Sequence, residues 1–164
     1  MEDRFLYSEL EDTIFIMIEG NATMKNSKTL SDLLKQIFDG EKKNLVFEMS
    51  KCNYLDSTFL GLIAKCALEI KKKWSSTLYI MNASNMVMNG LKQTGIDKFI
   101  EKLEDENLDI EATEIEKSDF SERKDKTLYI LEMHKTLVDL NDKNKETFKN
   151  VVDMIEKDLE KQNK

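Results

Sequence analysis

The sequence predicts an α/β fold in which a mixed β-sheet packs against helices, with a helical extension at the C-terminus. Short segments of alternating or continuous apolar residues are typical of strands, and longer segments with apolar residues every three to four positions are typical of amphipathic helices. A strand, a helix and a second strand follow one another over residues 44–81, as in a βαβ unit with parallel strands and a right-handed crossover. Acidic charge is concentrated after residue 100, which sets the extension apart.

The length and charge of the chain predict its domain organisation. It has 164 residues, of which 40% are hydrophobic, enough for one domain with a real core. Residues 1–100 contain 13 acidic and 13 basic residues, so the whole net charge of −7 lies in residues 101–164. We therefore expect a domain over residues 1–105 and an acidic, mainly helical extension over residues 106–164.

The same features bear on partners and location. An acidic excess argues against nucleic acids and anionic membrane surfaces as partners, because both attract positive charge, and it favours proteins. The sequence contains no run of about 18 apolar residues, so we expect no membrane insertion. Its N-terminus lacks the basic start and apolar centre of a signal peptide, and it has only two cysteines. These features predict a cytoplasmic protein.

The first elements follow from local patterns. Residues 5–10 and 13–18 are apolar or alternating runs separated by Glu11 and Asp12, which predicts a β-hairpin that ends at Gly20. Residues 27–38 repeat apolar side chains at helical spacing, which predicts a helix with one buried stripe that stops at Gly40. The stripe consists of Leu30, Leu33, Leu34, Ile37 and Phe38.

The next elements form the βαβ unit. Residues 44–49 predict a strand, residues 50–55 a loop, and residues 57–74 a helix that is apolar nearly all round and therefore the most buried. Three lysines, Lys71 to Lys73, occupy its last turn, where cations suit the helix dipole. Residues 77–81 predict another strand, and residues 86–94 a short helix ending at Gly95.

The remainder of the chain predicts one strand and two helices. Residues 108–112 alternate, which predicts an edge strand. Apolar residues then keep helical spacing on both sides of a turn at residues 141–144, which predicts a helical hairpin. Two interpretations stay open: a hairpin docked on the domain or on a second copy of the chain, as in a homodimer through the C-terminal helices, or a partner-binding appendage.

Residue types that carry out catalysis are scarce. His134 is the only histidine and lies on a predicted helix of the extension, so we interpret it as a surface or packing residue. The sequence has no glycine-rich phosphate loop and no set of metal ligands. Cys66 falls in the most apolar helix and is expected to be an inert core thiol, whereas Cys52 falls in a loop and is expected to be exposed. We therefore expect no enzyme activity, no cofactor and no metal.

One candidate site stands out where the loop after residue 49 enters the buried helix. Asp56, Ser57 and Thr58 stand at that point, and ligands and switches of open α/β sheets tend to lie at such strand ends. One interpretation is simple capping of the helix. The other is phosphorylation of Ser57, which adds about −1.5 to −2 charges. A helix N-terminus accommodates a phosphate, and the charge beside Asp56 would repel a docked partner without unfolding the domain.

Two stretches around this site resemble the core motif of STAS domains, as in bacterial anti-sigma factor antagonists. They are the segment LVFEMS at residues 45–50 and the segment YLDSTFLGLI at residues 54–63. Residues 89–99 resemble the stretch before the last strand of the family, and the order of elements agrees over residues 5–105. Phe59 stands where the family usually has glycine, and Glu48 stands where aspartate is common.

The resemblance implies a role for the site. The serine that follows the aspartate is the phosphate acceptor in phosphorylatable members, which implies Ser57 here. The surrounding switch loop, which would bind the partner, comprises Tyr54, Asp56, Thr58 and Phe59. The unphosphorylated protein would bind an anti-sigma factor that is also a serine kinase, phosphorylation would break the complex, and a phosphatase would restore it.

The alternative is a STAS domain that is not phosphorylated. It would serve as a scaffold or as an accessory subunit of a signalling or transport assembly, and the helical extension would be its docking surface. In that case Ser57 would only cap its helix.

Overall fold

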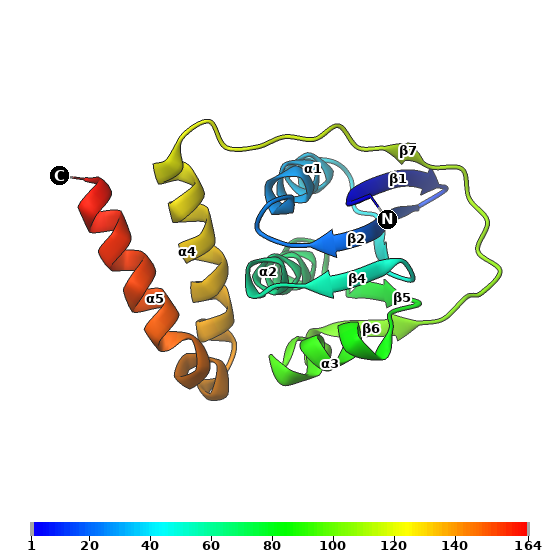
Figure 1. The fold of residues 1–164 in the computed structure, drawn as a ribbon. Helices are drawn as coiled ribbons and strands as arrows, with labels where there is room; N and C mark the ends of the chain where they lie inside the picture. The colour runs from blue at the N-terminus through cyan, green and yellow to red at the C-terminus, as the bar shows by residue number, and fades with distance from the viewer. Residues whose placement is uncertain (1, 164) are drawn as a thin grey trace.

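The computed structural model describes residues 2–163 and shows a mixed sheet with helices packed on it (Figure 1). The strands are β1 (Arg4–Leu10), β2 (Thr13–Ala22), β3 (Asn44–Glu48), β4 (Cys52–Leu55), β5 (Leu78–Met81), β6 (Ile100–Leu103) and β7 (Thr113–Glu114). The helices are α1 (Ser27–Asp39), α2 (Ser57–Trp74), α3 (Asn85–Gln93), the 3₁₀-helix η1 (Ile96–Phe99), α4 (Arg123–Leu140) and α5 (Asp142–Gln162).

The sheet has the order β6-β5-β3-β2-β1-β7, and β4 pairs with β2 off this path. The predicted hairpin is present, since β1 and β2 pair antiparallel with Phe5 opposite Ile18. The β3–β5 pair is parallel, as the predicted βαβ unit requires, and the β2–β3 and β5–β6 pairs are parallel as well. The predicted mixed α/β fold with a C-terminal helical extension is therefore confirmed.

The core lies between the sheet and helices α1 and α2. These two helices cover one face of the sheet, and α4 packs on the outer side of α2 (Figure 1). Phe59 of α2 stacks on Phe5 of β1 with ring centroids 5.9 Å apart. The nearly continuous apolar surface of α2 is explained by this position, because the sheet and α4 bury the helix from two sides.

The predicted edge strand at residues 108–112 is wrong. These residues have no regular secondary structure, and the edge is formed instead by β7, which pairs antiparallel with β1. Leu108 and Ile110 pack on a small apolar cluster, Phe15, Val46 and Met81, on the face of the sheet opposite α1 and α2. Their alternation therefore reflects a chain segment covering a sheet face, and alternation alone does not distinguish this from strand pairing.

The predicted loop at residues 50–55 contains a short strand. Beyond Gly20, which has a φ of 81°, β2 continues and pairs in parallel with β4. Cys52 lies in β4 and is 3% exposed, so the expectation of an exposed thiol is wrong. Burial raises the pKa of this thiol, and its Sγ lies 3.6 Å from the carbonyl oxygen of Tyr54.

The C-terminal helices pack against the domain in cis. Asn141 caps α5, and its Oδ1 accepts a hydrogen bond from the Asn144 amide at 2.8 Å. The side-chain amides of Asn141 and Asn144 both donate to the carbonyl oxygen of Thr94, at 3.0 and 2.7 Å. The turn between α4 and α5 is therefore tied to the end of α3. Over residues 2–163, no helix combines the length and the apolar composition needed to cross a bilayer.

Candidate functional site

Asp56 organises the start of α2. One carboxylate oxygen accepts a hydrogen bond from the Phe59 amide at 2.9 Å, which caps the helix as its sequence position predicts. The other oxygen accepts from the Met24 amide at 2.8 Å, and the Asp56 amide donates to the carbonyl oxygen of Ala22 at 3.1 Å. Asp56 therefore joins the N-terminus of α2 to the loop between β2 and α1.

Ser57 is the first residue of α2, and its side chain meets the C-terminal extension. Its Oγ lies 2.9 Å from Nε2 of His134 on α4, and the other ring nitrogen, Nδ1, lies 2.8 Å from the carbonyl oxygen of Ile130. A carbonyl only accepts, so Nδ1 carries a proton, and the tautomer with its proton on Nδ1 has an acceptor at Nε2. In that tautomer the Ser57 hydroxyl donates to His134.

His134 belongs to this site, although its position in the sequence gave no indication of that. It is only 4% exposed and its ring lies edge-on to Phe148 of α5, with centroids 6.0 Å apart. A packing role was one of the two expectations, but the bond to Ser57 was not foreseen. The two residues are 77 positions apart, and nothing in the local pattern around either one points to the other.

The predicted switch-loop residues do not share one surface. Tyr54 is 51% exposed, and Asp56 and Ser57 are half-buried. Thr58 and Phe59 are buried, and Phe59 fills the core against Phe5. The bulky residue at a position where the family usually has glycine therefore points inward, and its side chain adds no exposed surface beside Ser57.

Glu48 stabilises the neighbouring strand end. Its Oε1 accepts hydrogen bonds from the amide and the hydroxyl of Ser50, both at 2.9 Å, and its Oε2 accepts from the side-chain amide of Asn82 at 2.7 Å. The side-chain amide of Asn82 also donates to the carbonyl oxygen of Asp105, and its Oδ1 accepts from the Asp105 amide. The glutamate thus links the turn after β3 to the segments that follow β5 and β6.

Helix α4 covers the side of α2 on which Ser57 lies. Glu132 of α4 forms an ion pair with Lys65 at 2.7 Å, and the hydroxyl of Tyr129 lies 2.6 Å from Oγ of Ser27 on α1. Burial raises the pKa of Tyr129 to about 12. The backbone of Met133 packs directly on Gly61, where an added Cβ would lie 2.8 Å from both the carbonyl carbon and the Cβ of Met133. This contact requires a residue without a side chain at position 61.

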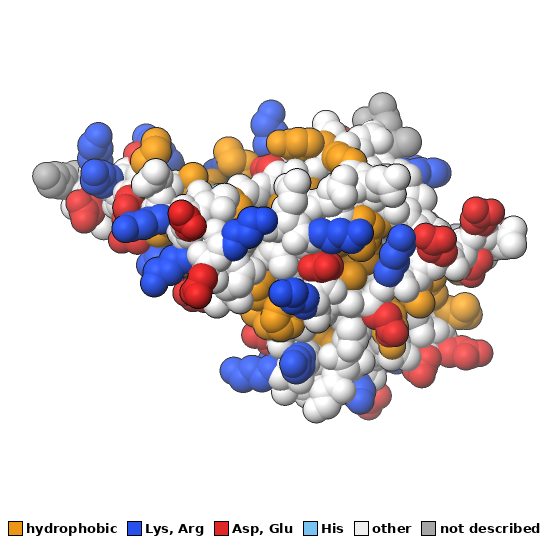
Figure 2. Space-filling model, turned by 90° about the horizontal axis from the view of Figure 1, so that it is seen from below, with side chains coloured by type: hydrophobic (Ala, Val, Ile, Leu, Met, Phe, Trp, Pro, Cys, Tyr) orange, Lys and Arg blue, Asp and Glu red, His pale blue; other side chains and the backbone are white. Residues whose placement is uncertain are grey.

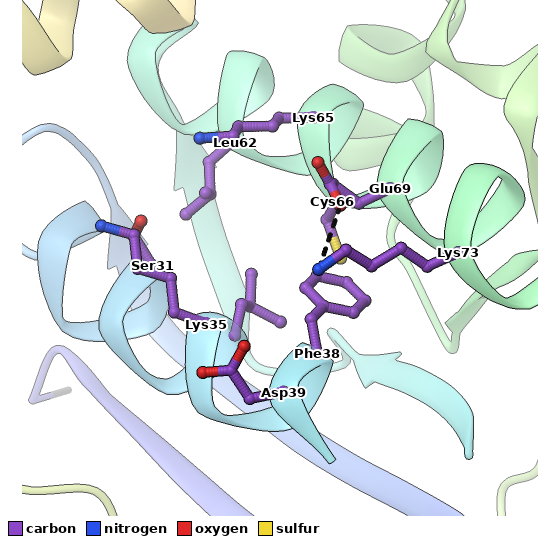
Figure 3. A pocket seen from close by; sticks show the side chains of 10 residues that line it. Ser31, Lys35, Phe38, Asp39, Leu62, Lys65, Cys66, Glu69 and Lys73 are labelled. Carbon is purple, nitrogen blue, oxygen red and sulfur yellow. Dashed lines mark ion pairs between the residues drawn. The ribbon is translucent and has the colours of Figure 1, made fainter. Parts of the chain in front are cut away.

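A groove of about 330 Å³ lies farther along α2, between this helix and α1 (Figure 3). Lys73 lies over the ring of Phe38 and forms an ion pair of 3.9 Å with Glu69. Cys66 lies at the groove, and burial raises the pKa of its thiol, as expected for an inert core cysteine. The lining residues are Ser31, Leu34, Lys35, Phe38, Asp39, Leu62, Lys65, Cys66, Glu69 and Lys73.

On the face shown in Figure 2, basic and acidic side chains are interspersed. Within residues 2–163, no group of three or more His, Cys, Asp or Glu side chains is placed to hold a metal ion. The chemical features of the site are therefore a helix N-terminus, a hydroxyl and a capping carboxylate.

Comparison with known proteins supports the resemblance seen in the motif. The family model of the STAS domain matches residues 6–112, a range that ends before α4 begins. A search of curated proteins found no match.

Solved structures have the same fold. The anti-sigma factor antagonist SpoIIAA in its unphosphorylated form is similar with a TM-score of 0.50 and 16% identity, over 60% of this chain and 86% of that chain. A protein from Thermotoga maritima assigned as an anti-sigma factor antagonist is similar with a TM-score of 0.52 and 18% identity, over 62% of this chain and 87% of that chain. The family match spans more than half of the sequence, and the chain belongs to the STAS domain family.

Proposed function

We propose that this protein is a cytoplasmic anti-sigma factor antagonist controlled by phosphorylation of Ser57. One observation carries the proposal: in a STAS domain, Ser57 presents a hydroxyl at the first position of α2, directly after the capping residue Asp56. Both solved structures described above are anti-sigma factor antagonists by description. The partners are an anti-sigma factor that is also a serine kinase, and a phosphatase that reverses the modification.

The geometry of the helix terminus suits this switch. Asp56 already satisfies the Phe59 amide, and the other amides of the first turn and the positive end of the helix dipole remain to stabilise a phosphate. The fold would therefore survive the modification. A phosphate adds about −1.5 to −2 charges next to the Asp56 carboxylate, which weakens binding of an acidic or closely packed partner.

The modification itself can be measured directly. The protein is isolated from its native cells during growth and stress, and the peptide over residues 53–65 is analysed by mass spectrometry. We expect partial phosphate on Ser57. Complete absence of phosphate under all conditions would contradict the proposal.

Partner switching is tested with three full-length variants used to capture the anti-sigma factor. Ser57→Ala should bind at least as tightly as the unmodified chain does, and Ser57→Asp should bind at least about tenfold more weakly, a difference of about 1.4 kcal/mol. Ser75→Asp is the matched control, because it places the same charge at the exposed opposite end of α2. Equal binding by Ser57→Asp and Ser57→Ala would rule out the switch.

A second function is favoured by the extension, in which α5 exposes Val151 and Met154 to 38% and 70%. In this scaffold function the Ser57 hydroxyl only forms the hydrogen bond with His134 and is not phosphorylated. A partner binds the outer face of α5. Met154→Glu should then abolish partner capture while both Ser57 variants retain it. The opposite pattern would favour the phosphorylation switch.

A further inference from the structure

The surface around Ser57 already has an occupant from the same chain. Ser57, Gly61 and Lys65 are four residues apart on α2 and therefore lie on one stripe of the helix. Each meets one residue of α4: His134 accepts from the Ser57 hydroxyl, Met133 packs its backbone on Gly61, and Glu132 pairs with Lys65. The stripe is thus covered at three successive turns of α2.

We propose that α4 is an intramolecular cover of the Ser57 surface, so that a kinase or protein partner reaches Ser57 only when the α4–α5 hairpin leaves α2. This inference rests on the proposed function of Ser57 and adds its regulation. The hairpin lies beyond residues 6–112, the range that matches the family model. It is therefore an addition to the STAS domain that competes with a partner for one surface of it.

The cover excludes phosphate transfer while it is docked. In that transfer the Ser57 oxygen bonds to the γ-phosphorus of a nucleoside triphosphate, the bond to the diphosphate breaks, and the hydroxyl proton passes to a base of the kinase. The Ser57 oxygen instead faces Nε2 of His134 at 2.9 Å, and His134 is 4% exposed. This spacing leaves no room for a phosphate between them.

Departure of the hairpin breaks the hydrogen bonds of Asn141 and Asn144 to Thr94, but it breaks no strand pairing. The connection from β7 to α4 has no regular secondary structure. It contacts the domain through the pair of hydrogen bonds between Ser118 and Thr29 of α1 and through Ile115, which packs against the main core. Helix α4 keeps α5 as a partner when it separates from α2, because the two helices pack along each other (Figure 1).

Gly61→Ala is a variant that opens the cover selectively. The added Cβ would lie 2.8 Å from the carbonyl carbon and Cβ of Met133, so α4 must move away, whereas alanine suits the interior of α2 better than glycine does. Gly90→Ala is the matched control. Its Cβ would lie 3.7 Å from the nearest atom of Leu60, an ordinary contact that leaves α4 in place.

Two measurements on the full-length protein report on the cover without a kinase. His134 is the only histidine of the chain, so its acylation by diethyl pyrocarbonate, followed by mass spectrometry, reports whether α4 is docked. In a Ser57→Cys background, labelling by the thiol reagent DTNB reports access to position 57, because Cys52 and Cys66 are buried. Gly61→Ala should accelerate both reactions at least about tenfold, and Gly90→Ala should not.

A charge exchange provides a second route, which avoids the packing change at Gly61. Lys65→Glu places two carboxylates at the position of the ion pair with Glu132 and should accelerate both reactions. Adding Glu132→Lys restores opposite charges and should return both rates toward those of the unmodified chain. A general loss of structure would not be rescued in this way.

The outcomes separate the two proposals. Unchanged rates at His134 and position 57 in Gly61→Ala and Lys65→Glu would overturn the cover, even if phosphate is found on Ser57 in cells. Accelerated rates together with complete absence of phosphate in cells would support the cover and contradict the phosphorylation switch.

Discussion

At the scale of single residues, the site depends on two side chains that each serve two segments. Asp56 uses one oxygen to cap α2 and the other to hold the loop before α1 through the Met24 amide. Ser57 donates to His134 and so connects the start of α2 with α4. The residue pair that is interpreted as a phosphorylation motif is therefore also a structural junction.

Loss of the Asp56 carboxylate should destabilise the domain. Asp56→Ala leaves two backbone amides without their acceptor, and we expect it to lower the free energy of unfolding by about 1–2 kcal/mol, as removal of a helix cap does. Asp56→Asn keeps an acceptor oxygen for the Phe59 amide and should lose less. Urea unfolding of the three proteins measures this difference, and equal stabilities of Asp56→Ala and the unmodified chain would contradict the capping role.

Loss of the Ser57 hydroxyl should also be measurable. Ser57→Ala leaves Nε2 of His134, a buried acceptor, without its donor, and an unsatisfied buried polar group costs about 1–3 kcal/mol. Ser57→Thr retains the hydroxyl and should be closer to the unmodified chain. The comparison is made by urea unfolding, and a stability of Ser57→Ala above that of Ser57→Thr would show that the bond to His134 contributes nothing.

At the scale of elements, α2 is the centre of the molecule because it is buried from two sides. Its apolar residues face the sheet and α1, and its stripe at Ser57, Gly61 and Lys65 faces α4. The tyrosine of α4, Tyr129, extends this contact to α1 through the hydroxyl of Ser27. The contact between α4 and α1 thus includes a half-buried phenol whose pKa is raised by burial.

Docking of α4 should therefore weaken in alkali. Burial raises the pKa of Tyr129 to about 12 from the ordinary value of 10, so between these values the folded chain keeps a proton that the unfolded chain has lost. Stability from this group is complete below pH 10 and falls as the pH rises toward 12, by at most about 2–3 kcal/mol. Tyr129→Phe should lose less stability than the unmodified chain over this interval in urea unfolding. If Tyr129→Phe and the unmodified chain lost equal free energies of unfolding over this interval, this role of Tyr129 would be refuted.

At the scale of the whole molecule, one continuous chain covers both faces of the sheet. Helices α1 and α2 cover one face, and the segment with Leu108 and Ile110 crosses the other on its way to β7. The extension is thus connected to the domain by a segment that is itself part of the packing. The acidic charge after residue 100 is spread over this segment and the hairpin.

Removing an anchor of that segment should expose the sheet face. Leu108→Ala uncovers part of the cluster formed by Phe15, Val46 and Met81. Truncating a fully buried leucine to alanine lowers the free energy of unfolding by about 2–5 kcal/mol. Because Leu108 is only partly buried, we expect a smaller loss. Binding of an apolar dye should rise. The control is Asp109→Ala, at the exposed neighbouring position, which should leave both the stability and the dye binding unchanged. Equal dye binding by the two variants would contradict the packing described.

Local patterns in the sequence determined most of the fold. The hairpin, the βαβ unit and the bounds of α2 followed from apolar spacing, from Asp56 as a cap and from glycines at helix ends, because these signals act over a few residues. The motif around Ser57 was also local, and it led to the family. In contrast, only the tertiary structure decided that residues 108–112 cover a sheet face and that Cys52 is buried in a strand.

The tertiary structure also decided the environment of the site. Phe59 points into the core, and His134 meets Ser57 from 77 residues away. Gly61 meets the backbone of Met133. Such contacts join residues whose own neighbourhoods are ordinary, so no periodicity in either segment encodes them. The sequence alone therefore determined which helix presents Ser57, and packing between distant segments decided what covers it.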